Sequence, residues 1–291
     1  MPNINNSVEI FPNWGYLNLR LYRFIFSVRP AFLALFLKWL LGIKRRWIHL
    51  QGVKFFIDPV SHFGQEVINT GSYEPLFCDS IMKLLKPGDS FLDIGANEGF
   101  FSIKAASVVG SKGKVIAIEP QPDLADLIAI NSKNNGFENL QVQPLAFSEK
   151  KGKVELALSL SVNTGTSSLF TNKVSGFDRI WVCGEPFDEW WLSQSKPFFD
   201  AVKIDCEGAE VFIFRTANKA LGQHFAKMIF LEYHENIIGS EGVWEIDDAI
   251  RSNGYILSEL KTGVWVYHLS ENSIIPAQMV RRTVPRLKPG E

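Results

Sequence analysis

Short runs of hydrophobic residues alternate along this chain with stretches in which hydrophobic residues recur at helical spacing. The run at residues 91–94 ends in a turn bracketed by glycines, and a helical pattern follows directly. Runs of this kind predict strands at residues 90–94, 114–119, 140–145, 201–205, 228–233, 255–260 and 264–268. Helices are predicted at residues 77–85, 100–109, 122–135, 209–220 and 244–253. This alternation is typical of an α/β fold with a mostly parallel sheet.

The pattern also divides the chain into regions. The last two predicted strands are joined by only Lys261-Thr262-Gly263, so they form an antiparallel hairpin. An insert at residues 151–198 has its own strand-like pieces, at 154–158 and 180–182, and a Gly, Ser and Thr-rich stretch at 163–168. We therefore predict an accessory helical region at 1–58 that ends in a short strand, a main domain at 59–272 with this insert, and a tail at 273–291.

A strand, a turn, a helix and a second strand follow one another between residues 90 and 119. Gly95 and Gly99 bracket the turn, and the second strand ends at an acidic residue, Glu119. A carboxylate at this place in a βαβ unit binds the ribose of a nucleotide. An ordinary tight turn would explain the glycines but not Glu119, so we expect a nucleoside-bearing cofactor.

The residues of the turn favour one cofactor over another. A dinucleotide-binding turn needs a further glycine between Gly95 and Gly99, where the backbone approaches a pyrophosphate, and that glycine is missing. Asp93 and Glu98 would repel a pyrophosphate, whereas they would attract the ammonium and sulfonium groups of S-adenosyl-L-methionine. The sequence therefore predicts S-adenosyl-L-methionine, and an NAD-dependent oxidoreductase is the remote alternative.

A second cluster of polar residues follows the predicted strand at 201–205. Lys203 is in the strand, and three acids, Asp205, Glu207 and Glu210, follow as the chain enters a helix. Ligands of open α/β sheets bind beyond the carboxyl ends of the strands, so Asp205 is expected in the same crevice as Glu119. Acids in a first turn also stabilise a helix N-terminus, which accounts for one of the three but not for all.

Seven motifs occur in an order that resembles the FkbM family of S-adenosylmethionine-dependent methyltransferases. They are Gly71-Ser-Tyr-Glu-Pro75, Leu85-Lys-Pro-Gly-Asp89, Leu92-Asp-Ile-Gly-Ala-Asn-Glu-Gly-Phe-Phe-Ser102, Ile118-Glu-Pro120, Asn131 with Asn134, Ala146-Phe-Ser148 and Lys203-Ile-Asp-Cys-Glu-Gly-Ala-Glu210. The resemblance covers roughly residues 58–268. It implies a Rossmann-like class I methyltransferase fold and O-methylation of a hydroxyl on a sugar, a glycan or a secondary metabolite. Where the family usually shows Ala-Leu-Ser and Asp-Val-Glu-Gly, this chain has Phe147 and Cys206, and neither change removes an expected polar contact.

Position and resemblance together give each site residue an expected role. The turn should wrap the methionine part of the cofactor, with Asp93 at its amino group, while Glu119 accepts hydrogen bonds from both ribose hydroxyls. Ala146 and Phe147 should border the adenine, and the residues at 73–74 should close over the cofactor. The expected cofactor contacts are Tyr73, Glu74, Asp93, Gly95, Asn97, Gly99, Phe100, Glu119, Pro120, Ala146, Phe147 and Asp205.

Methyl transfer to an alcohol needs a base that removes the hydroxyl proton. The candidates are Asp205, Glu207 and His234, and a histidine of near-neutral pKa would suit the role, although His234 could also be hydrogen-bonded in its loop. Asp205, Glu232 and His234 are ligand types that suit Mg or Mn, but no tight ligand spacing supports a metal site, so we expect none. The insert at 151–198 is the expected acceptor-binding region. Trp181, Trp190 and Trp191 lie in it, where they stack on an acceptor sugar, pack in the core or form a subunit interface.

Composition is ordinary for a globular protein, with 46% hydrophobic residues and a net charge of −1, which gives no case for nucleic-acid binding. Cys78, Cys183 and Cys206 are odd in number and scattered, so we expect a reducing, cytoplasmic location. The expected partner is a small-molecule or glycan acceptor. N-methylation, a lipid-linked glycan acceptor at a membrane surface and a non-catalytic binding module are alternatives, the last disfavoured by the intact cofactor turn and Asp205 cluster.

The N-terminal region combines basic and apolar residues. Eight Lys or Arg residues against two acids give the chain up to Asp58 a charge of +6. One helical stripe consists of Phe32, Leu35, Phe36, Trp39, Leu40 and Ile43 and is followed by Lys44-Arg45-Arg46. Arg29, Pro30 and Lys38 leave no apolar stretch of the roughly 20 residues that a spanning helix needs. A peripheral membrane contact through residues 17–48, a cap over a pocket and packing on the chain itself or on a second copy, as a homo-oligomer, are all open.

Overall fold

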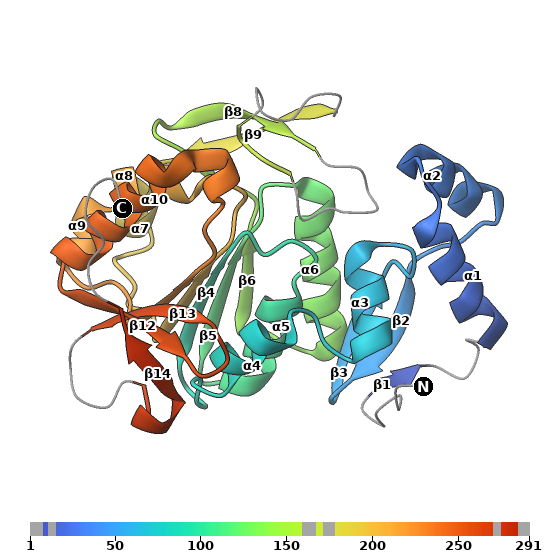
Figure 1. Cartoon of the computed structure of the whole chain (residues 1–291), viewed down its shortest axis with the longest axis horizontal. Helices are drawn as coiled ribbons and strands as arrows, with labels where there is room; N and C mark the ends of the chain where they lie inside the picture. Colours follow the sequence, from blue (N-terminus) through green and yellow to red (C-terminus); the bar gives the residue numbers. More distant parts are fainter. Residues whose placement is uncertain (1–7, 11–15, 159–166, 171–177, 270–274, 285–291) are drawn as a thin grey trace.

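A mixed sheet forms the centre of the protein, and helices cover both of its faces (Figure 1). The computed structural model describes residues 8–10, 16–158, 167–170, 178–269 and 275–284. The strands of the sheet are β4 Ser90–Ile94, β5 Lys114–Ile118, β6 Leu140–Gln143, β10 Ala201–Ile204, β11 Met228–Leu231, β12 Tyr255–Leu260, β13 Trp265–Leu269 and β14 Val280–Thr283. Their order is β14-β12-β13-β11-β10-β4-β5-β6, in which β6, β5, β4, β10 and β11 are parallel to one another and the last three strands pair antiparallel.

This sheet confirms the predicted α/β, Rossmann-like fold with its antiparallel C-terminal hairpin, and all seven predicted strands are present. The eighth strand, β14, belongs to the stretch predicted as a tail. Arg281 and Arg282 of β14 both form ion pairs with Glu259 of β12, and these pairs hold the strand at the edge of the sheet. Residues 285–291 of the predicted tail lie outside the described residues.

The two faces of the sheet bury different helices. One face is covered by α3 His62–Thr70, α4 Pro75–Met82, α5 Phe100–Val109 and α6 Pro122–Asn135, and the other by α7 Phe187–Ser193, α8 Glu210–Thr216, α9 Asn218–Gly222 and α10 Glu235–Ser252. Side chains of β4 alternate between them, with Phe91 on the first face and Leu92 on the second. The helix predicted at 209–220 is divided into α8 and α9 at Ala217.

Strand pairing brings together two motifs that are far apart in the sequence. β10 lies beside β4 in the sheet, in parallel, and Lys203 is opposite Asp93. β5 lies on the other side of β4. The carboxyl ends of the three strands therefore meet at one edge, as the sequence analysis expected for the turn after β4, Glu119 and Asp205.

The N-terminal region is less helical than predicted. It contains α1 Tyr16–Ser27 and α2 Ala31–Leu40, but also a three-stranded antiparallel sheet of β1 Val8–Ile10, β2 Arg46–Leu50 and β3 Val53–Ile57. This small sheet packs on the main domain, because Phe55 stacks on Phe100 of α5 and the backbone N–H of Phe56 donates to Asn131 of α6. Among the described residues, no helix combines the length and the apolar character that crossing a bilayer requires.

Part of the insert forms a second small sheet beyond the carboxyl ends of the central strands, at the top of Figure 1. It consists of β7 Ala146–Phe147, β8 Gly152–Ala157 and β9 Arg179–Glu185, in the order β7-β9-β8. The strand-like pieces predicted at 154–158 and 180–182 correspond to β8 and β9. Of the predicted Gly, Ser and Thr-rich stretch, residues 163–166 lie outside the described residues.

Candidate active site

A pocket of about 260 Å³ lies at the carboxyl ends of β4, β5, β10 and β11. Its walls come from the turn after β4, the residues after β5, β7, the turn after β10 and the start of α10. Leu156 of β8 and Leu169 of the insert also line the pocket. The pocket thus occupies the place where open α/β sheets bind their ligands.

The turn after β4 needs its glycines for two physical reasons. Gly95 and Gly99 have φ angles of +77° and +83°, in the left-handed region that favours glycine. A Cβ on Gly95 would also lie 1.8 Å from the carbonyl oxygen of Asp205, and a Cβ on Gly99 would lie 2.7 Å from the side chain of Ile128 in α6. The backbone of the first turn is therefore in contact with the turn after β10.

Three residues other than glycine in the pocket wall also have left-handed backbones. Glu74, Asn97 and Glu207 have φ angles of 44°, 51° and 52°. Residues with side chains are uncommon in this region, because their Cβ atoms crowd the backbone. Strained backbone of this kind collects at functional sites, where the surrounding structure holds it.

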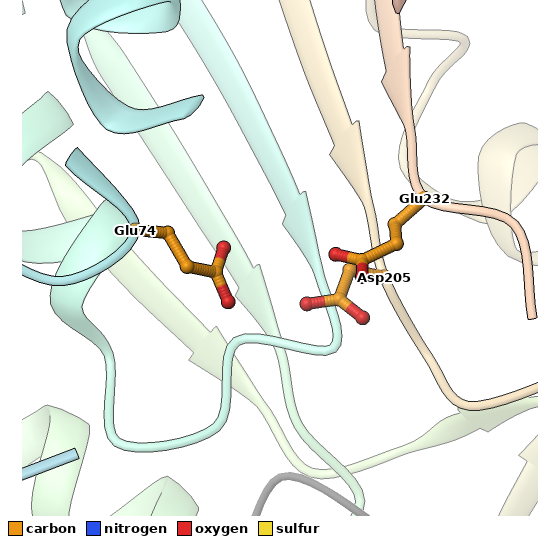
Figure 2. A group of neighbouring side chains, drawn as sticks. All are labelled: Glu74, Asp205 and Glu232. Atoms are coloured by element: carbon orange, nitrogen blue, oxygen red, sulfur yellow. The ribbon is translucent and has the colours of Figure 1, made fainter. Parts of the chain in front are cut away.

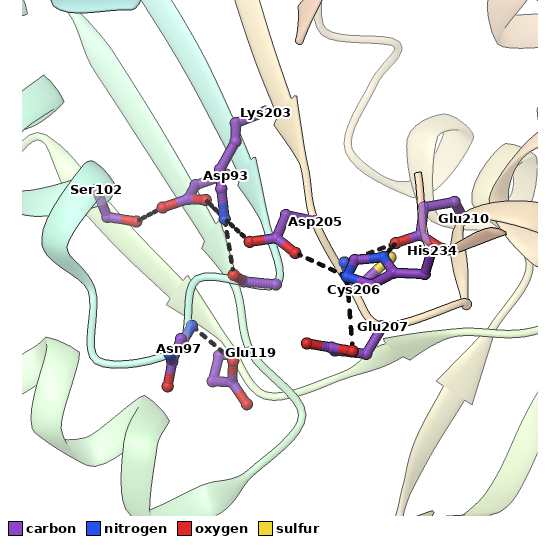
Figure 3. A network of polar contacts seen from close by, with 11 residues as sticks. Asp93, Asn97, Ser102, Glu119, Lys203, Asp205, Cys206, Glu207, Glu210 and His234 are labelled. Atoms are coloured by element: carbon purple, nitrogen blue, oxygen red, sulfur yellow. Dashed lines mark hydrogen bonds and ion pairs between the residues drawn. The ribbon is translucent and has the colours of Figure 1, made fainter. Parts of the chain in front are cut away.

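Glu119 is held at the end of β5 with both carboxylate oxygens toward backbone donors. The N–H of Asn97 donates to Oε2 at 2.8 Å (Figure 3). The N–H of Gln121 donates to Oε1 at 2.9 Å. Burial raises the pKa of Glu119 to about 7, although these two hydrogen bonds lower it. Each carboxylate oxygen can accept a further hydrogen bond, so Glu119 can accept hydrogen bonds from two hydroxyl groups of a ribose.

Lys203 connects the two motifs of the site. Its buried ammonium donates to the carbonyl oxygen of Gly95 at 3.1 Å and lies 3.1 Å from Asp205 Oδ2 and 3.6 Å from Asp93 Oδ1 (Figure 3). Burial lowers the pKa of Lys203, but the charges of Asp205 and Asp93 outweigh this effect and raise it above its usual range. Lys203 therefore stays charged and fixes Asp205 against the cofactor turn.

His234, which immediately precedes α10, is surrounded by acids. Its Nδ1 is 2.8 Å from Oε1 of the fully buried Glu210, and its Nε2 lies 3.7 Å from Asp205 Oδ1 and 3.5 Å from Glu207 Oε2 (Figure 3). Burial lowers the pKa of His234, but the hydrogen bond to Glu210 and the neighbouring charges raise it to about 9. The pKa of His234 in the ligand-free chain is thus above the near-neutral value that would suit a general base.

Three carboxylates face one another across the pocket, from Glu74 before α4, Asp205 after β10 and Glu232 after β11. Glu74, Asp205 and Glu232 each place an oxygen within 4.8 Å of the others, and Figure 2 shows Glu74 facing the other two across the pocket. Burial and the charges of Asp205 and Glu232 raise the pKa of Glu74 to about 7, although Lys203 lowers it. Oxygen ligands of this type suit a divalent cation and equally suit an organic cation. The group differs from the set considered in the sequence analysis, because Glu74 replaces His234.

Most of the predicted site residues line the pocket, and two do not. Those in the wall are Tyr73, Glu74, Gly95, Asn97, Phe100, Glu119, Pro120, Ala146, Phe147, Asp205, Glu207 and His234. Asp93 lies behind the wall, where Ser102 donates to it at 2.6 Å and Lys203 neutralises it, so it supports the turn rather than facing the pocket. Gly99 does not line the pocket either, and a side chain at this position would meet Ile128 of α6.

Lys203 and His62 belong to the pocket wall, although neither was assigned a role from the sequence. Lys203 lies between Val202 and Ile204 in a buried strand. A charged side chain is rare at such a position, and this was the indication in the sequence that Lys203 has a specific role. His62 lies at the start of α3, a helix that was not predicted, and no feature of the sequence connects it with the motifs.

The tryptophans of the insert separate into two kinds. Trp190 and Trp191 are buried and pack in the core, where Trp190 also donates to Gln143 and Trp191 to the carbonyl oxygen of Pro197. Trp181 is 67% exposed and does not line the pocket. Core packing is therefore the role of Trp190 and Trp191, and stacking of Trp181 on an acceptor stays a prediction.

A sequence profile described as the Methyltransferase FkbM domain matches residues 93–257, which is more than half of the chain. The chain belongs to the FkbM methyltransferase family. The matched region begins in β4 and ends in β12, so it contains the cofactor turn, Glu119 and the turn after β10. Family membership confirms the resemblance found in the sequence and the expected cofactor of the family, S-adenosyl-L-methionine.

Three individual proteins illustrate what this FkbM family member is similar to. It is 37% identical over 88 residues to a protein-L-isoaspartate O-methyltransferase of Methanococcus aeolicus, which is 30% of this chain and 40% of that protein. It is 32% identical over 82 residues to a probable cobalt-precorrin-6B C(15)-methyltransferase (decarboxylating) of Sulfolobus acidocaldarius, 28% and 43% of the two chains. The match thus spans less than half the length of both relatives. A putative O-methyltransferase structure from Klebsiella pneumoniae has 12% identity and a TM-score of 0.42, over 68% of this chain and 80% of that one.

Proposed function

We propose that this FkbM family member is an S-adenosyl-L-methionine-dependent O-methyltransferase that acts on a hydroxyl group of a sugar, a glycan or a secondary metabolite. The main support for this proposal is the charge of the pocket wall. Among its lining residues, the acids Glu74, Glu119, Asp205, Glu207 and Glu232 outnumber the cations Lys203 and His234. Negative side chains in this number favour a ligand that carries positive charge and disfavour a pyrophosphate.

The polar groups of the pocket fit the two ends of such a cofactor. Glu119, held by two backbone amides, offers acceptors for the ribose hydroxyls, and Ala146 and Phe147 offer an apolar wall for the adenine. Asp205 and Glu74 offer carboxylates to the ammonium and sulfonium groups. When bound, S-adenosyl-L-methionine supplies an electrophilic methyl group.

His234 is the proposed general base for the acceptor hydroxyl. Glu210 accepts a hydrogen bond from Nδ1–H, which fixes the ring and leaves Nε2 toward Asp205 and Glu207 in the pocket wall. In the ligand-free chain Nε2 is protonated. Positive charge bound among the surrounding acids lowers the pKa of His234, because it offsets their negative charges. The ring then loses its proton and can accept one from the acceptor hydroxyl.

The two curated relatives name different acceptors, a protein carboxyl group and a carbon atom, so the acceptor is inferred from the site. Carboxylates of Glu207 and Glu232 can accept hydrogen bonds from a ligand with several hydroxyl groups. Leu156, Ser167 and Leu169 of the insert complete the pocket on the side of β8. We therefore assign acceptor binding to the space between the insert and the turn after β10.

Calorimetric titration tests the cofactor. We expect S-adenosyl-L-methionine to bind and NAD to bind at least tenfold more weakly. Glu119→Gln should weaken S-adenosyl-L-methionine binding roughly tenfold to a hundredfold, because a hydrogen bond to a charged group contributes about 1.5–3 kcal/mol. Glu138→Gln, a change of the same kind at an exposed residue outside the pocket, is the control and should bind normally. Tighter binding of NAD, or no binding of S-adenosyl-L-methionine, would contradict the proposal.

Release of S-adenosylhomocysteine from mixtures of sugars, glycans and hydroxylated metabolites tests the reaction. We expect turnover with a hydroxyl acceptor, and His234→Gln should lower kcat roughly 10²–10⁴-fold. The variant should still bind S-adenosyl-L-methionine, at least as tightly as the wild type, because it lacks the positive imidazole beside the charge of the cofactor. Turnover with amines but not with their hydroxyl counterparts would replace O-methylation by N-methylation while leaving the cofactor assignment intact.

A further inference from the structure

The hairpin of α1 and α2 exposes a continuous group of large hydrophobic side chains. They are Leu21, Phe24, Phe32, Leu33, Phe36, Trp39, Leu40 and Leu41. Trp39 is the most exposed of them, at 75%. Patches of this kind on soluble domains mark surfaces that meet a protein or a membrane. Figure 1 shows the hairpin at the edge of the molecule, away from the central sheet and next to α3.

The helix α2 is apolar apart from Lys38, yet only part of its surface is covered. Ala34 and Leu37 face the chain, where they pack with Tyr22 and Ile25 of α1 and with Val60. Within the part of the chain that the structure describes, no residue covers the opposite face. An apolar helix face is normally buried, so this face lacks its expected partner.

The charge around the hairpin identifies the partner. Residues 10–57 contain eight Lys or Arg and no Asp or Glu, and two of the eight, Lys38 and Arg45, pair with acids elsewhere in the chain. Arg29 and Lys44, both exposed, flank the two ends of α2. A second copy of the chain would bring the same positive charge to the contact and be repelled, whereas anionic lipid headgroups would be attracted.

We propose that the α1–α2 hairpin docks the protein on an anionic lipid surface. The apolar face of α2 lies in the plane of the interface, with Phe32, Phe36 and Trp39 toward the acyl chains and Arg29 and Lys44 at the headgroups. Tryptophan suits this position because its ring is apolar and its N–H is polar. α2 has ten residues, half of what crossing a bilayer takes, so the contact is peripheral.

The docking surface is attached directly to the rim of the pocket. The rings of Phe26 in α1 and His62 in α3 are 6.3 Å apart, and His62 lines the pocket. Lys38 of α2 forms an ion pair with Asp58, which precedes α3. These contacts join the hairpin to the wall of the pocket. The proposal does not depend on the proposed enzymatic activity.

Vesicle flotation of the full chain tests the proposal. We expect the protein to float with vesicles of equal parts phosphatidylcholine and phosphatidylglycerol, and to remain free with phosphatidylcholine alone. The double variant Phe36→Ser/Trp39→Ser should bind the anionic vesicles roughly tenfold or more weakly, because the apolar area that enters the lipid is lost. Trp181→Ser, which removes an equally exposed tryptophan from β9, is the matched control and should float as the wild type does.

A second variant tests the role of charge. For each variant, calorimetric titration with S-adenosyl-L-methionine or thermal unfolding shows that the protein is folded. Arg29→Gln/Lys44→Gln should reduce binding to anionic vesicles, and added salt should have the same effect on the wild type. Binding that is equal on neutral and anionic vesicles would overturn the proposal. So would a wild-type dimer in sedimentation velocity that Phe36→Ser/Trp39→Ser converts to a monomer, because the face would then be an interface between copies.

Discussion

At the scale of single residues, folding raises the pKa of several groups in the pocket, so they bind protons more tightly than in the unfolded chain. Folding raises the pKa of His234 from 6.5 to about 9 and the pKa of Glu74, Glu119 and Glu207 from 4.5 to about 7. A group whose pKa is higher in the folded state stabilises the fold below its unfolded pKa and loses this contribution as the pH rises through the folded pKa. The carboxyl contribution is therefore lost between pH 4.5 and about 7, and the histidine contribution between pH 6.5 and about 9.

We therefore expect these four groups to make the ligand-free chain less stable as the pH rises from about 5 to about 9. Urea unfolding at several pH values measures this. In Glu119→Gln the decrease between about pH 5 and 7 should be smaller, because one of the proton-binding groups is absent, and the decrease above pH 7 should be unchanged. A wild-type free energy of unfolding that rises across this range, with no difference in the variant, would show that the acids of the pocket are ionised in the free chain.

Glu210 acts on the proposed reaction only through His234. Glu210→Gln keeps an acceptor for the backbone N–H of Cys206 and removes the negative charge that holds the proton on the imidazole. We expect the pKa in the pH profile of kcat/KM to fall toward the ordinary value of about 6.5, with kcat lowered roughly tenfold or more. Cofactor affinity from calorimetry should not change. A purely structural role would instead lower stability and cofactor affinity and leave the pH profile where it is.

The contacts of His234 and Lys203 mark the limit of what could be predicted for single residues. The cofactor turn and Glu119 are close together in sequence, and their spacing alone indicated their chemistry. The pair of Lys203 and Asp93 depends instead on the register of β10 beside β4, and the pair of His234 and Glu210 on where α10 begins relative to α8. Neither pair could be predicted from a local sequence pattern, because each depends on how elements far apart in the chain are arranged.

At the scale of elements, the turn after β4 contacts the turn after β10, and adding one methyl group at Gly95 tests this contact. Gly95→Ala should remove detectable cofactor binding, because its Cβ would overlap the carbonyl oxygen of Asp205 and push the turns apart. Gly136→Ala is the matched control, since Gly136 has a similar φ of +69° but no atom within 4 Å of the new Cβ. Both variants should lose about 1 kcal/mol or more of stability from the left-handed backbone. Calorimetry should show lost binding only for Gly95→Ala, and equal binding by both variants would contradict this account.

Helices with clear ends were predicted to the residue, and elements defined by distant partners were not. α5 follows Gly99 and ends before Gly110, and α6 starts at Pro122 and ends before Gly136, so local residues determine both helices. β2 and β14 become strands only by pairing with β3 and β12, and their sequences, Arg46–Leu50 and Val280–Thr283, have no distinctive alternation. The domain boundaries at 58 and 272 stay a prediction.

At the scale of the whole molecule, the N-terminal region is joined to the cofactor turn. Arg45, between α2 and β2, forms an ion pair with Glu98 of the turn, whose side chain is 1% exposed. Burial raises the pKa of Glu98, and the charge of Arg45 opposes this effect. The small N-terminal sheet, which hydrogen-bonds to α6 through Phe56 and Asn131, holds Arg45 in place. The region outside the matched family domain therefore supports the part of the site that lies inside it.

Arg45→Met should reveal this connection, because it leaves the buried carboxylate of Glu98 without its partner. We expect a loss of roughly 3 kcal/mol in the free energy of unfolding at neutral pH and weaker binding of S-adenosyl-L-methionine. Adding Glu98→Gln should restore part of the stability, since a neutral amide tolerates burial better than an unpaired carboxylate. The control is Lys83→Met, which breaks the exposed pair with Asp79 and should change stability by less than about 0.5 kcal/mol. If the two single variants unfold alike and bind the cofactor alike, the N-terminal region is not coupled to the site through Arg45.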